Sequence, residues 1–306
     1  MYHRFGEDNY PSTNISLDQF EDHIKILKQG PYTIWPVEKI VEYIKSGKEL
    51  PDYTVGITVD DAAASVYEQA WPRFKKAGIP FTLFVTTDDI DRNSKSYMNW
   101  DQLRELQKNG LVTIGNHTKS HAHMYAQSDL QNAQEIIGSQ KRFADELGME
   151  PKLFAYPYGE FSNAATAVVK RINFIAAFGQ HSGVTSRQED IYQLPRFSLN
   201  EHYGDAARFE QAARAMPLQA GIKGPQDSVL DQNPPGFSIT LAKGMDPSAM
   251  SCYASDQDQI KMQIKEQTVE LHLLKPWTKG RARLNCTMQD KETRRWFWIG
   301  RQYIVP

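Results

Sequence analysis

The stretch Val55-Gly56-Ile57-Thr58-Val59-Asp60-Asp61 joins a short apolar run to a pair of carboxylates. A second stretch has the same form, because the run Leu111-Val112-Thr113-Ile114-Gly115 leads into Asn116-His117-Thr118-Lys119-Ser120-His121. Nearly continuous apolar runs are typical of parallel strands that are buried on both faces. Active sites of parallel α/β folds lie at the carboxyl ends of their strands, so the two polar clusters are expected to meet.

Further apolar runs extend this pattern through about the first 215 residues. Strands are predicted at 55–60, 81–86, 112–117, 152–156, 174–179 and 192–198. Helices are predicted between them, among them one opened by Ser16 and ended by Gly30-Pro31, one at 66–77 and one at 129–147. Repeated βα units of this length predict an α/β fold, either a parallel barrel or a doubly wound sheet.

The pattern changes near Pro217. The stretch 221–236 is rich in Gly, Pro, Asp and Gln, and it is interpreted as a linker between a domain of residues 1–220 and a small module of residues 237–306. Strands are expected in that module at 237–243, 250–255, 260–266, 268–274, 281–288 and 294–304. Short strands with alternating polarity, as in Ile260-Lys261-Met262-Gln263-Ile264-Lys265, predict an antiparallel β-sandwich.

The composition is that of a folded globular protein, with 40% hydrophobic and 24% charged residues. A net charge of −2 argues against general binding of nucleic acid. Basic residues are concentrated at 261–301; a normal polar surface is the simpler interpretation, and contact with an acidic polymer or a membrane surface is the alternative. No apolar run reaches the ~18 residues of a transmembrane helix, and the first residues do not resemble a signal peptide.

Cys252 and Cys286 are the two cysteines of the chain. They could form one disulfide in an exported protein, or remain two buried thiols in a protein that stays in the cytoplasm. The sequence leaves both possibilities open.

The two polar clusters together offer ligands for a metal. Taken alone, Asp60-Asp61 could cap a helix, and a lone histidine is usually solvated or hydrogen-bonded. Two imidazoles and one carboxylate, however, form a three-ligand set that leaves a divalent metal open positions for water and substrate. The spare carboxylate would be placed to take a proton from that water. The residues therefore predict a metal-dependent hydrolase, in which the nearby His123 is expected not to bind.

These stretches resemble the motifs of a known family, the polysaccharide deacetylases of carbohydrate esterase family 4, also called the NodB-homology domain. Ile57-Thr58-Val59-Asp60-Asp61 resembles the first motif and His117-Thr118-Lys119-Ser120-His121 the second. Phe154-Ala155-Tyr156-Pro157-Tyr158-Gly159 resembles the third, and the resemblance covers roughly residues 1–215. It implies a distorted (β/α) barrel and a hydrolase that removes N-acetyl groups from an N-acetylated polysaccharide, with a metal-bound water as the nucleophile.

The resemblance also implies a role for each motif residue. Asp61, His117 and His121 would bind a divalent metal, with Zn²⁺ expected and Co²⁺ or Ni²⁺ as alternatives. Asp60 would be the general base, and the backbone N–H of Tyr158 would stabilise the oxyanion. The side chains of Tyr156 and Tyr158 are expected to line a sugar groove.

The general acid has two candidates. Most of the family uses a histidine in a Leu-x-His setting at the end of the barrel, which Leu271-His272-Leu273 resembles, although it lies in the predicted sandwich. The exopolysaccharide deacetylases of biofilms instead carry a Tyr-His pair at the start of the domain, which Tyr2-His3 resembles. We expect His3 to be the acid.

The chain departs from the family at the arginine that usually orients the base, because Ala155 stands at that position of the third motif. Arg196, in Leu194-Pro195-Arg196-Phe197, could supply the cation from another direction; a surface arginine is the alternative. Ala62 and Ala122 also stand where the family usually has Gly and Pro.

Two other functions remain open at this stage. One is a small-molecule amide hydrolase on the same fold, and the other is a non-catalytic glycan-binding protein that has kept the metal site. The complete Asp-Asp and His-His set favours an enzyme, whereas the missing motif arginine favours the binding protein. The exopolysaccharide branch implies a periplasmic or extracytoplasmic location. The particular polymer and the oligomeric state do not follow from the sequence.

Overall fold

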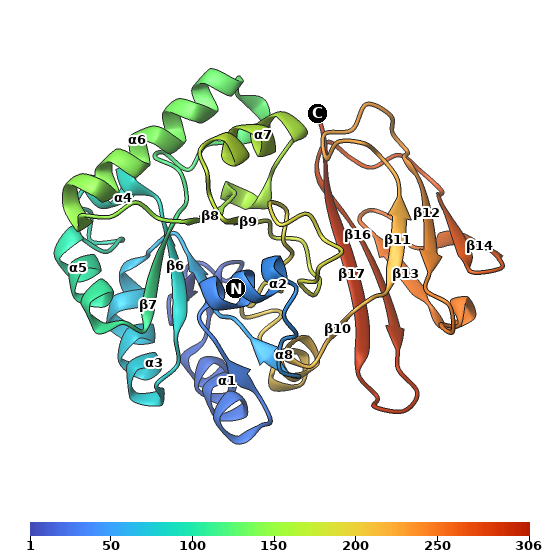
Figure 1. The fold of residues 1–306 in the computed structure, drawn as a ribbon, viewed down its shortest axis with the longest axis horizontal. Helices are drawn as coiled ribbons and strands as arrows, with labels where there is room; N and C mark the ends of the chain where they lie inside the picture. The colour runs from blue at the N-terminus through green and yellow to red at the C-terminus, as the bar shows by residue number, and fades with distance from the viewer.

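The computed structural model describes all residues, 1–306, as an α/β part followed by two β-sheets (Figure 1). A parallel sheet in the order β5-β6-β7-β8-β9 forms the centre of the α/β part. Its strands are β5 (Thr58–Asp60), β6 (Phe81–Val85), β7 (Val112–Asn116), β8 (Leu153–Ala155) and β9 (Ala176–Phe178). The sequence predicted all five of these strands.

The sheet continues at both edges through single bridges, which pair Tyr2 with Val59 and Leu194 with Phe178. It is therefore a curved, partial barrel. The strand predicted at 192–198 is wrong, because only Leu194 pairs with the sheet. Pro195 follows it and has no N–H to donate to a ladder, which explains why the pairing stops there.

Helices cover the outside of this barrel, and most have clear end signals. They are α1 (Leu17–Gln29), α2 (Val37–Ser46), α3 (Trp71–Ala77), α4 (Thr87–Asp91), α5 (Trp100–Asn109), α6 (Asp129–Leu147), α7 (Asn163–Arg171) and α8 (Ala206–Ala213). Ser16, Asn99 and Ser128 each form a capping box at a helix start. The helix predicted at 66–77 is divided, because residues Val66–Ala70 form a π-helical turn before α3.

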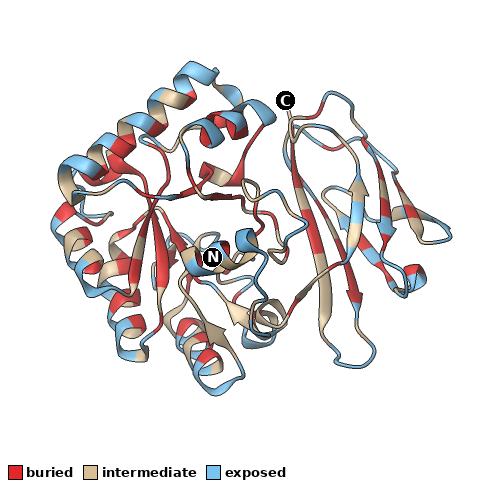
Figure 2. Cartoon of the chain, in the orientation of Figure 1, coloured by how far each residue is buried: buried red, intermediate tan, exposed pale blue.

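Buried residues follow the strands and the inner faces of the helices (Figure 2). The largest apolar cluster has 27 buried residues and includes Tyr2 and Phe5 from the start of the chain. Residues at the start are also fixed by hydrogen bonds, from Tyr2 N–H to the carbonyl of Thr58 and from Asp60 N–H to the carbonyl of Tyr2. The first residues are thus part of the barrel edge.

Two four-stranded sheets form the C-terminal part of the molecule. One contains β10 (Met216–Pro217), β17 (Trp296–Val305), β16 (Gly280–Gln289) and β13 (Ser251–Ala254). The other contains β11 (Ala220–Lys223), β12 (Gly236–Leu241), β15 (Thr268–Leu273) and β14 (Ile260–Lys265). Their strands are antiparallel except for the pairing of β10 with β17, and one cluster of 17 buried residues joins the two sheets.

The boundary predicted for this part is wrong. Strands β10 and β11 already belong to the sheets, so a linker does not begin at residue 221. Ala220 and Ile222 pack against the C-terminal cluster, and β11 pairs with β12 from Ala220 to Lys223. These two apolar residues alternate as in a strand. The sequence analysis did not detect this strand, because the stretch that follows is rich in Gly, Pro, Asp and Gln.

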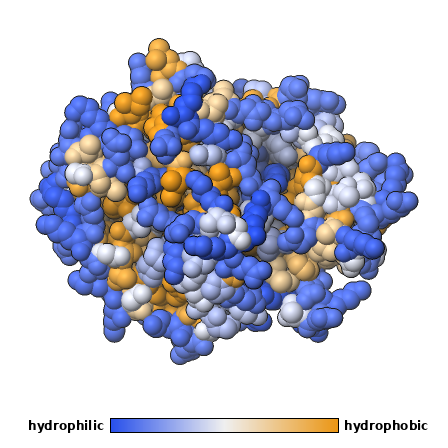
Figure 3. Space-filling model, viewed as in Figure 1, coloured by the Kyte–Doolittle hydropathy of each residue, from blue (hydrophilic) through white to orange (hydrophobic).

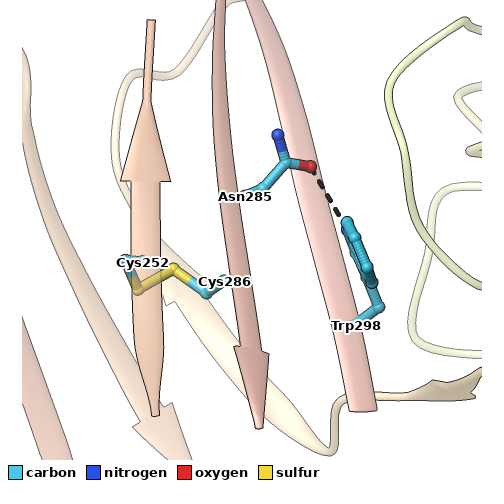
Figure 4. Close-up of a disulfide and its surroundings, with 4 residues drawn as sticks. All are labelled: Cys252, Asn285, Cys286 and Trp298. Atoms are coloured by element: carbon cyan, nitrogen blue, oxygen red, sulfur yellow. Dashed lines mark hydrogen bonds between the residues drawn. A yellow bond between two sulfur atoms is a disulfide. The ribbon is translucent and has the colours of Figure 1, made fainter. Parts of the chain in front are cut away.

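Cys252 and Cys286 form a disulfide between directly opposed positions of β13 and β16 (Figure 4). Of the two states that the sequence left open for these cysteines, the structure has the disulfide. None of the helices combines the length and the apolarity that crossing a bilayer requires.

Candidate active site

The structure brings Asp61, His117 and His121 together at the carboxyl end of the parallel sheet. One ligand atom from each lies within 4.8 Å of the others. The Nε2 atoms of His117 and His121 are 3.4 and 3.3 Å from Oδ1 of Asp61. The strand-end positions that the sequence indicated therefore do converge.

These three residues fit a divalent metal. The Oδ1 of Asp61 and the Nε2 of His117 are buried and have no hydrogen-bond partner in the protein. Such orphaned polar atoms are costly unless something binds them. Ligands about 2.0–2.1 Å from a tetrahedral zinc ion lie roughly 3.3 Å apart, which matches the observed separations.

Neighbouring groups orient the His117 ring and keep Asp61 negatively charged, and both effects favour the binding of a cation. The Nδ1 of His117 lies 2.7 Å from the carbonyl oxygen of Ala155, a contact that directs Nε2 toward the centre of the cluster. Burial would raise the pKa of Asp61, but the imidazoles of His117 and His121 hold that pKa well below its ordinary value. Asp61 is thus an anionic ligand, and at φ 73° its backbone is left-handed, which turns the chain sharply after β5.

Asp60 points to a different partner from Asp61. Its side chain is fully buried, and Arg196 donates to both of its oxygens, from Nη1 at 2.7 Å and Nη2 at 2.8 Å. Burial would raise the pKa of Asp60, but this guanidinium, together with His117 and His3, lowers it below the ordinary value. Arg196 is only 7% exposed, so it is not the surface arginine that the sequence left as an alternative.

His3 is partly buried between Tyr2 and Arg4 at the barrel edge. Burial lowers the pKa of its imidazole, and the nearby Asp61 and Asp60 oppose that shift. The side chain therefore lies within the electrostatic reach of both aspartates. His272, the other candidate acid, lies on β15 in the C-terminal sheets, and its side chain is 52% exposed.

The two tyrosines of the third motif have different environments. Tyr156 is fully buried, and its hydroxyl donates to Oγ1 of Thr166 at 3.3 Å. The prediction that Tyr156 lines a sugar groove is therefore wrong, because its side chain faces the core. Tyr158 is partly exposed, and its ring lies 4.4 Å from that of His121.

Tyr158 also has an available backbone donor. Its residue adopts φ 59° and ψ 5° within the short helix Pro157–Gly159. No carbonyl or side chain of the protein accepts its N–H. This free backbone donor lies in the residue whose ring contacts His121, which makes it a candidate for stabilising an oxyanion.

Sequence reasoning missed two residues around this donor. Glu160 is 5% exposed and binds Nδ1 of His123, whose ring stacks on Tyr158 with centroids 4.1 Å apart. His123 was expected only to be a residue that does not bind metal. The one available signal in the sequence was the position of Glu160 directly after the third motif. A carboxylate that is buried at such a position needs a partner.

A curved parallel α/β domain with an Asp-His-His cluster and a buried acid beside it is an arrangement typical of hydrolytic enzymes. The family model described as polysaccharide deacetylase matches residues 47–177. The poly-β-1,6-N-acetyl-D-glucosamine N-deacetylase of Staphylococcus aureus (strain MSSA476) is 26% identical over 201 residues, which cover 61% of this chain and 68% of the relative. Residues 47–177 therefore carry a polysaccharide deacetylase domain, and the chain is similar to enzymes of that family.

Solved structures show the same fold. The deacetylase PplD of Streptococcus pyogenes, in complex with acetate, has a TM-score of 0.64 at 19% identity, covering 70% of this chain and 96% of that one. IcaB of Ammonifex degensii has a TM-score of 0.60 at 24% identity, covering 70% of this chain and 94% of that one.

Proposed function

We propose that this protein is a metal-dependent N-deacetylase that acts on an N-acetylated polysaccharide. The observation that carries the proposal is the pairing of an Asp-His-His cluster with a second carboxylate that stays anionic beside Arg196. A poly-β-1,6-N-acetyl-D-glucosamine chain is the first substrate to test, because the Staphylococcus aureus relative is named for it.

Each residue of the site has a separate role in the proposed reaction. Asp61, His117 and His121 would hold the metal, which when bound supplies Lewis acidity and lowers the pKa of a coordinated water. Asp60 takes a proton from the attacking water, and Arg196 keeps Asp60 anionic. The N–H of Tyr158 donates to the developing oxyanion, and His3 gives a proton to the leaving amine nitrogen. Burial lowers the pKa of His3, whereas Asp61 and Asp60 oppose that shift and favour the protonated imidazole that donates.

The site is open to solvent, because the side chains of His121 and Asp61 keep 23% and 22% of their surface exposed. An open site suits a polymer better than it suits a small amide in a closed pocket. Figure 3 shows one face of the molecule, which is mostly hydrophilic with hydrophobic patches over the α/β part. We propose further that the two C-terminal sheets form a β-sandwich, and that the disulfide reflects a periplasmic or extracytoplasmic location.

Metal analysis and acetate release from one purified preparation test the proposal. The expected result is about one divalent ion per chain, zinc in the first instance, and acetate release from the polymer but not from monomeric N-acetylglucosamine. His117→Ala and His121→Ala should each lose most of the metal and the activity. Stoichiometric metal in both variants would overturn the ligand set.

The alternatives give different results in the same assays. Acetate release from small N-acetyl amides alone would identify a small-molecule amide hydrolase. Metal binding with no acetate release from any substrate, but with retention on immobilised polymer, would identify a glycan-binding protein.

A further inference from the structure

The turn that carries the Tyr158 N–H is held from outside the barrel. Gln302 lies on β17 and is 3% exposed. Its Nε2 donates to the carbonyl oxygens of Gly159 at 3.0 Å and Tyr158 at 3.3 Å. Arg281, on the neighbouring β16, also donates to the carbonyl of Tyr158, from Nη1 at 3.3 Å. In Figure 1, β16 and β17 belong to the sheet that faces the barrel.

This turn needs support, because its backbone is in an unfavourable conformation. Tyr158 has φ 59° and Gly159 has φ 68°. A left-handed conformation costs a residue with a side chain about 1–2 kcal/mol. The Tyr158 N–H belongs to the planar peptide unit before Tyr158, and the two held carbonyls belong to the units that follow it. With those following units fixed, the N–H can be redirected only by a change in φ or ψ of Tyr158 itself.

Glu160 provides a second connection between the turn and the C-terminal sheets. Its carboxylate lies 3.6 Å from Nε of Arg281 and also binds Nδ1 of His123. His123 stacks on Tyr158, whose ring in turn contacts the metal-ligand candidate His121. Arg281 and His123 thus both contact the carboxylate of Glu160, through Oε1 and Oε2, next to the same turn.

We infer that Gln302 and Arg281 are positioning residues of the active site, and that β16 and β17 form an integral part of the deacetylase. They hold the Tyr158 N–H where the oxyanion develops; this inference rests on the proposed function. The C-terminal sheets then contribute to the chemical step, which is more than the role of an accessory module. Neither residue touches the substrate.

Gln302→Met tests the inference, because methionine has a similar length and no N–H to donate. We expect kcat to fall by about 10–100-fold, since a displaced oxyanion donor loses most of its effect, while KM and metal content stay near those of the wild type. Arg301→Met is the matched control. Arg301 is the preceding residue on β17 and pairs with Glu189 at 3.1 Å, without contacting the turn.

Arg301→Met should keep kcat within about twofold of the wild type, because a partly exposed ion pair contributes little to stability. A wild-type kcat in Gln302→Met would overturn the inference. So would an equal loss in Arg301→Met, because the effect would then come from loosened docking of the sheets. Thermal unfolding of both variants checks that they are folded.

Hydrogen exchange separates this inference from the proposed function. The amides of Gly159 and Glu160 donate to the carbonyls of Tyr156 and Pro157 within the turn. They should exchange faster in Gln302→Met than in the wild type or in Arg301→Met. If the wild type releases no acetate from any substrate, the proposed function fails, yet faster exchange would still show that Gln302 holds the turn. Unchanged exchange would overturn that role.

Discussion

Asp60 and Asp61 are adjacent in the chain, yet they have different partners. Asp61 faces the two histidines, whereas Asp60 is buried against Arg196. We therefore expect Asp60→Asn to keep the metal and to lower kcat by about 10²–10⁴, the usual contribution of a general base. Metal content and acetate release, measured on the same preparation, check this expectation.

Asp61→Asn is the control for that experiment, because it should lose metal. The assignment would be reversed if Asp60→Asn lost the metal while Asp61→Asn kept it. Asp60→Asn also leaves the buried Arg196 charge uncompensated, which can destabilise a protein by about 3–5 kcal/mol. The assays should therefore be run well below the unfolding temperature of the variant.

Arg196 determines the pH range over which Asp60 can act. Its guanidinium keeps the pKa of the carboxyl below the ordinary value, although burial alone would raise it. Arg196→Met should raise that pKa, so a smaller fraction of Asp60 is anionic at low pH. The acid limb of the kcat/KM profile, which reports the free enzyme, should move to higher pH.

Arg196→Lys should move the limb less, because lysine keeps a charge but cannot bind both carboxylate oxygens in the same way. The activity of Arg196→Met relative to wild type should be lowest in acid and recover partly toward pH 8. An acid limb at the wild-type position would contradict the role of Arg196.

At the scale of elements, α1 stabilises the barrel edge through a buried histidine. His23 lies between the hydroxyl of Tyr2 and the carbonyl of Gly204, at 2.9 and 2.7 Å, and its ring stacks on Phe209 with centroids 3.9 Å apart. Burial lowers the pKa of His23 to about 4. The neutral imidazole therefore connects α1, the first residues and the loop before α8.

This linkage predicts how stability depends on pH. The unfolded chain protonates His23 near its ordinary pKa of about 6.5, whereas the folded protein does not until about pH 4. The unfolded state thus binds more protons in that interval, and the free energy of unfolding should fall by about 1.4 kcal/mol for each unit that the pH is lowered. His23→Gln should remove this contribution.

Urea unfolding at pH 7, 6 and 5 measures the effect. The difference between wild type and His23→Gln isolates His23 from the other titrating groups, such as the buried His181. His23→Gln should lose stability at pH 7 but show a smaller decrease toward pH 5. Parallel pH dependences in the two proteins would contradict the prediction.

At the scale of the whole molecule, the disulfide stabilises the sheets that hold the third-motif turn. Cys252 and Cys286 are 34 residues apart, and closing a loop of that length in the unfolded chain is worth about 4 kcal/mol. Cys252→Ser/Cys286→Ser should lower the free energy of unfolding of the C-terminal sheets by up to that amount. Urea unfolding with and without a reductant measures it.

The reductant should destabilise the wild type and leave the double variant unchanged. Two freely titrating thiols in the native, unreduced protein would contradict the disulfide. Because β16 carries both Cys286 and Arg281, reduction at elevated temperature should also impair acetate release before the barrel unfolds.

The sequence determined the strands of the parallel sheet and the three candidate metal ligands. Both depend on local patterns: continuous apolar runs form buried strands, and polar residues directly after them lie at a common edge. The acidic pair and the two histidines could therefore be brought together without knowledge of any other contact, whereas the choice of Asp61 over Asp60 as the ligand came from the family resemblance.

Only the tertiary structure decided how the other site residues lie. Arg196 reaches Asp60 across 136 residues, and Gln302 reaches Tyr158 across 144. Tyr156 faces the core, although Tyr158, two residues later, is partly exposed. Strands β10 and β11 belong to the C-terminal sheets, although the stretch that follows them is rich in Gly, Pro, Asp and Gln. The direction of a side chain after a strand, and the partner of a buried charge, depend on which distant surfaces pack against it, and this information is not contained in the local sequence pattern.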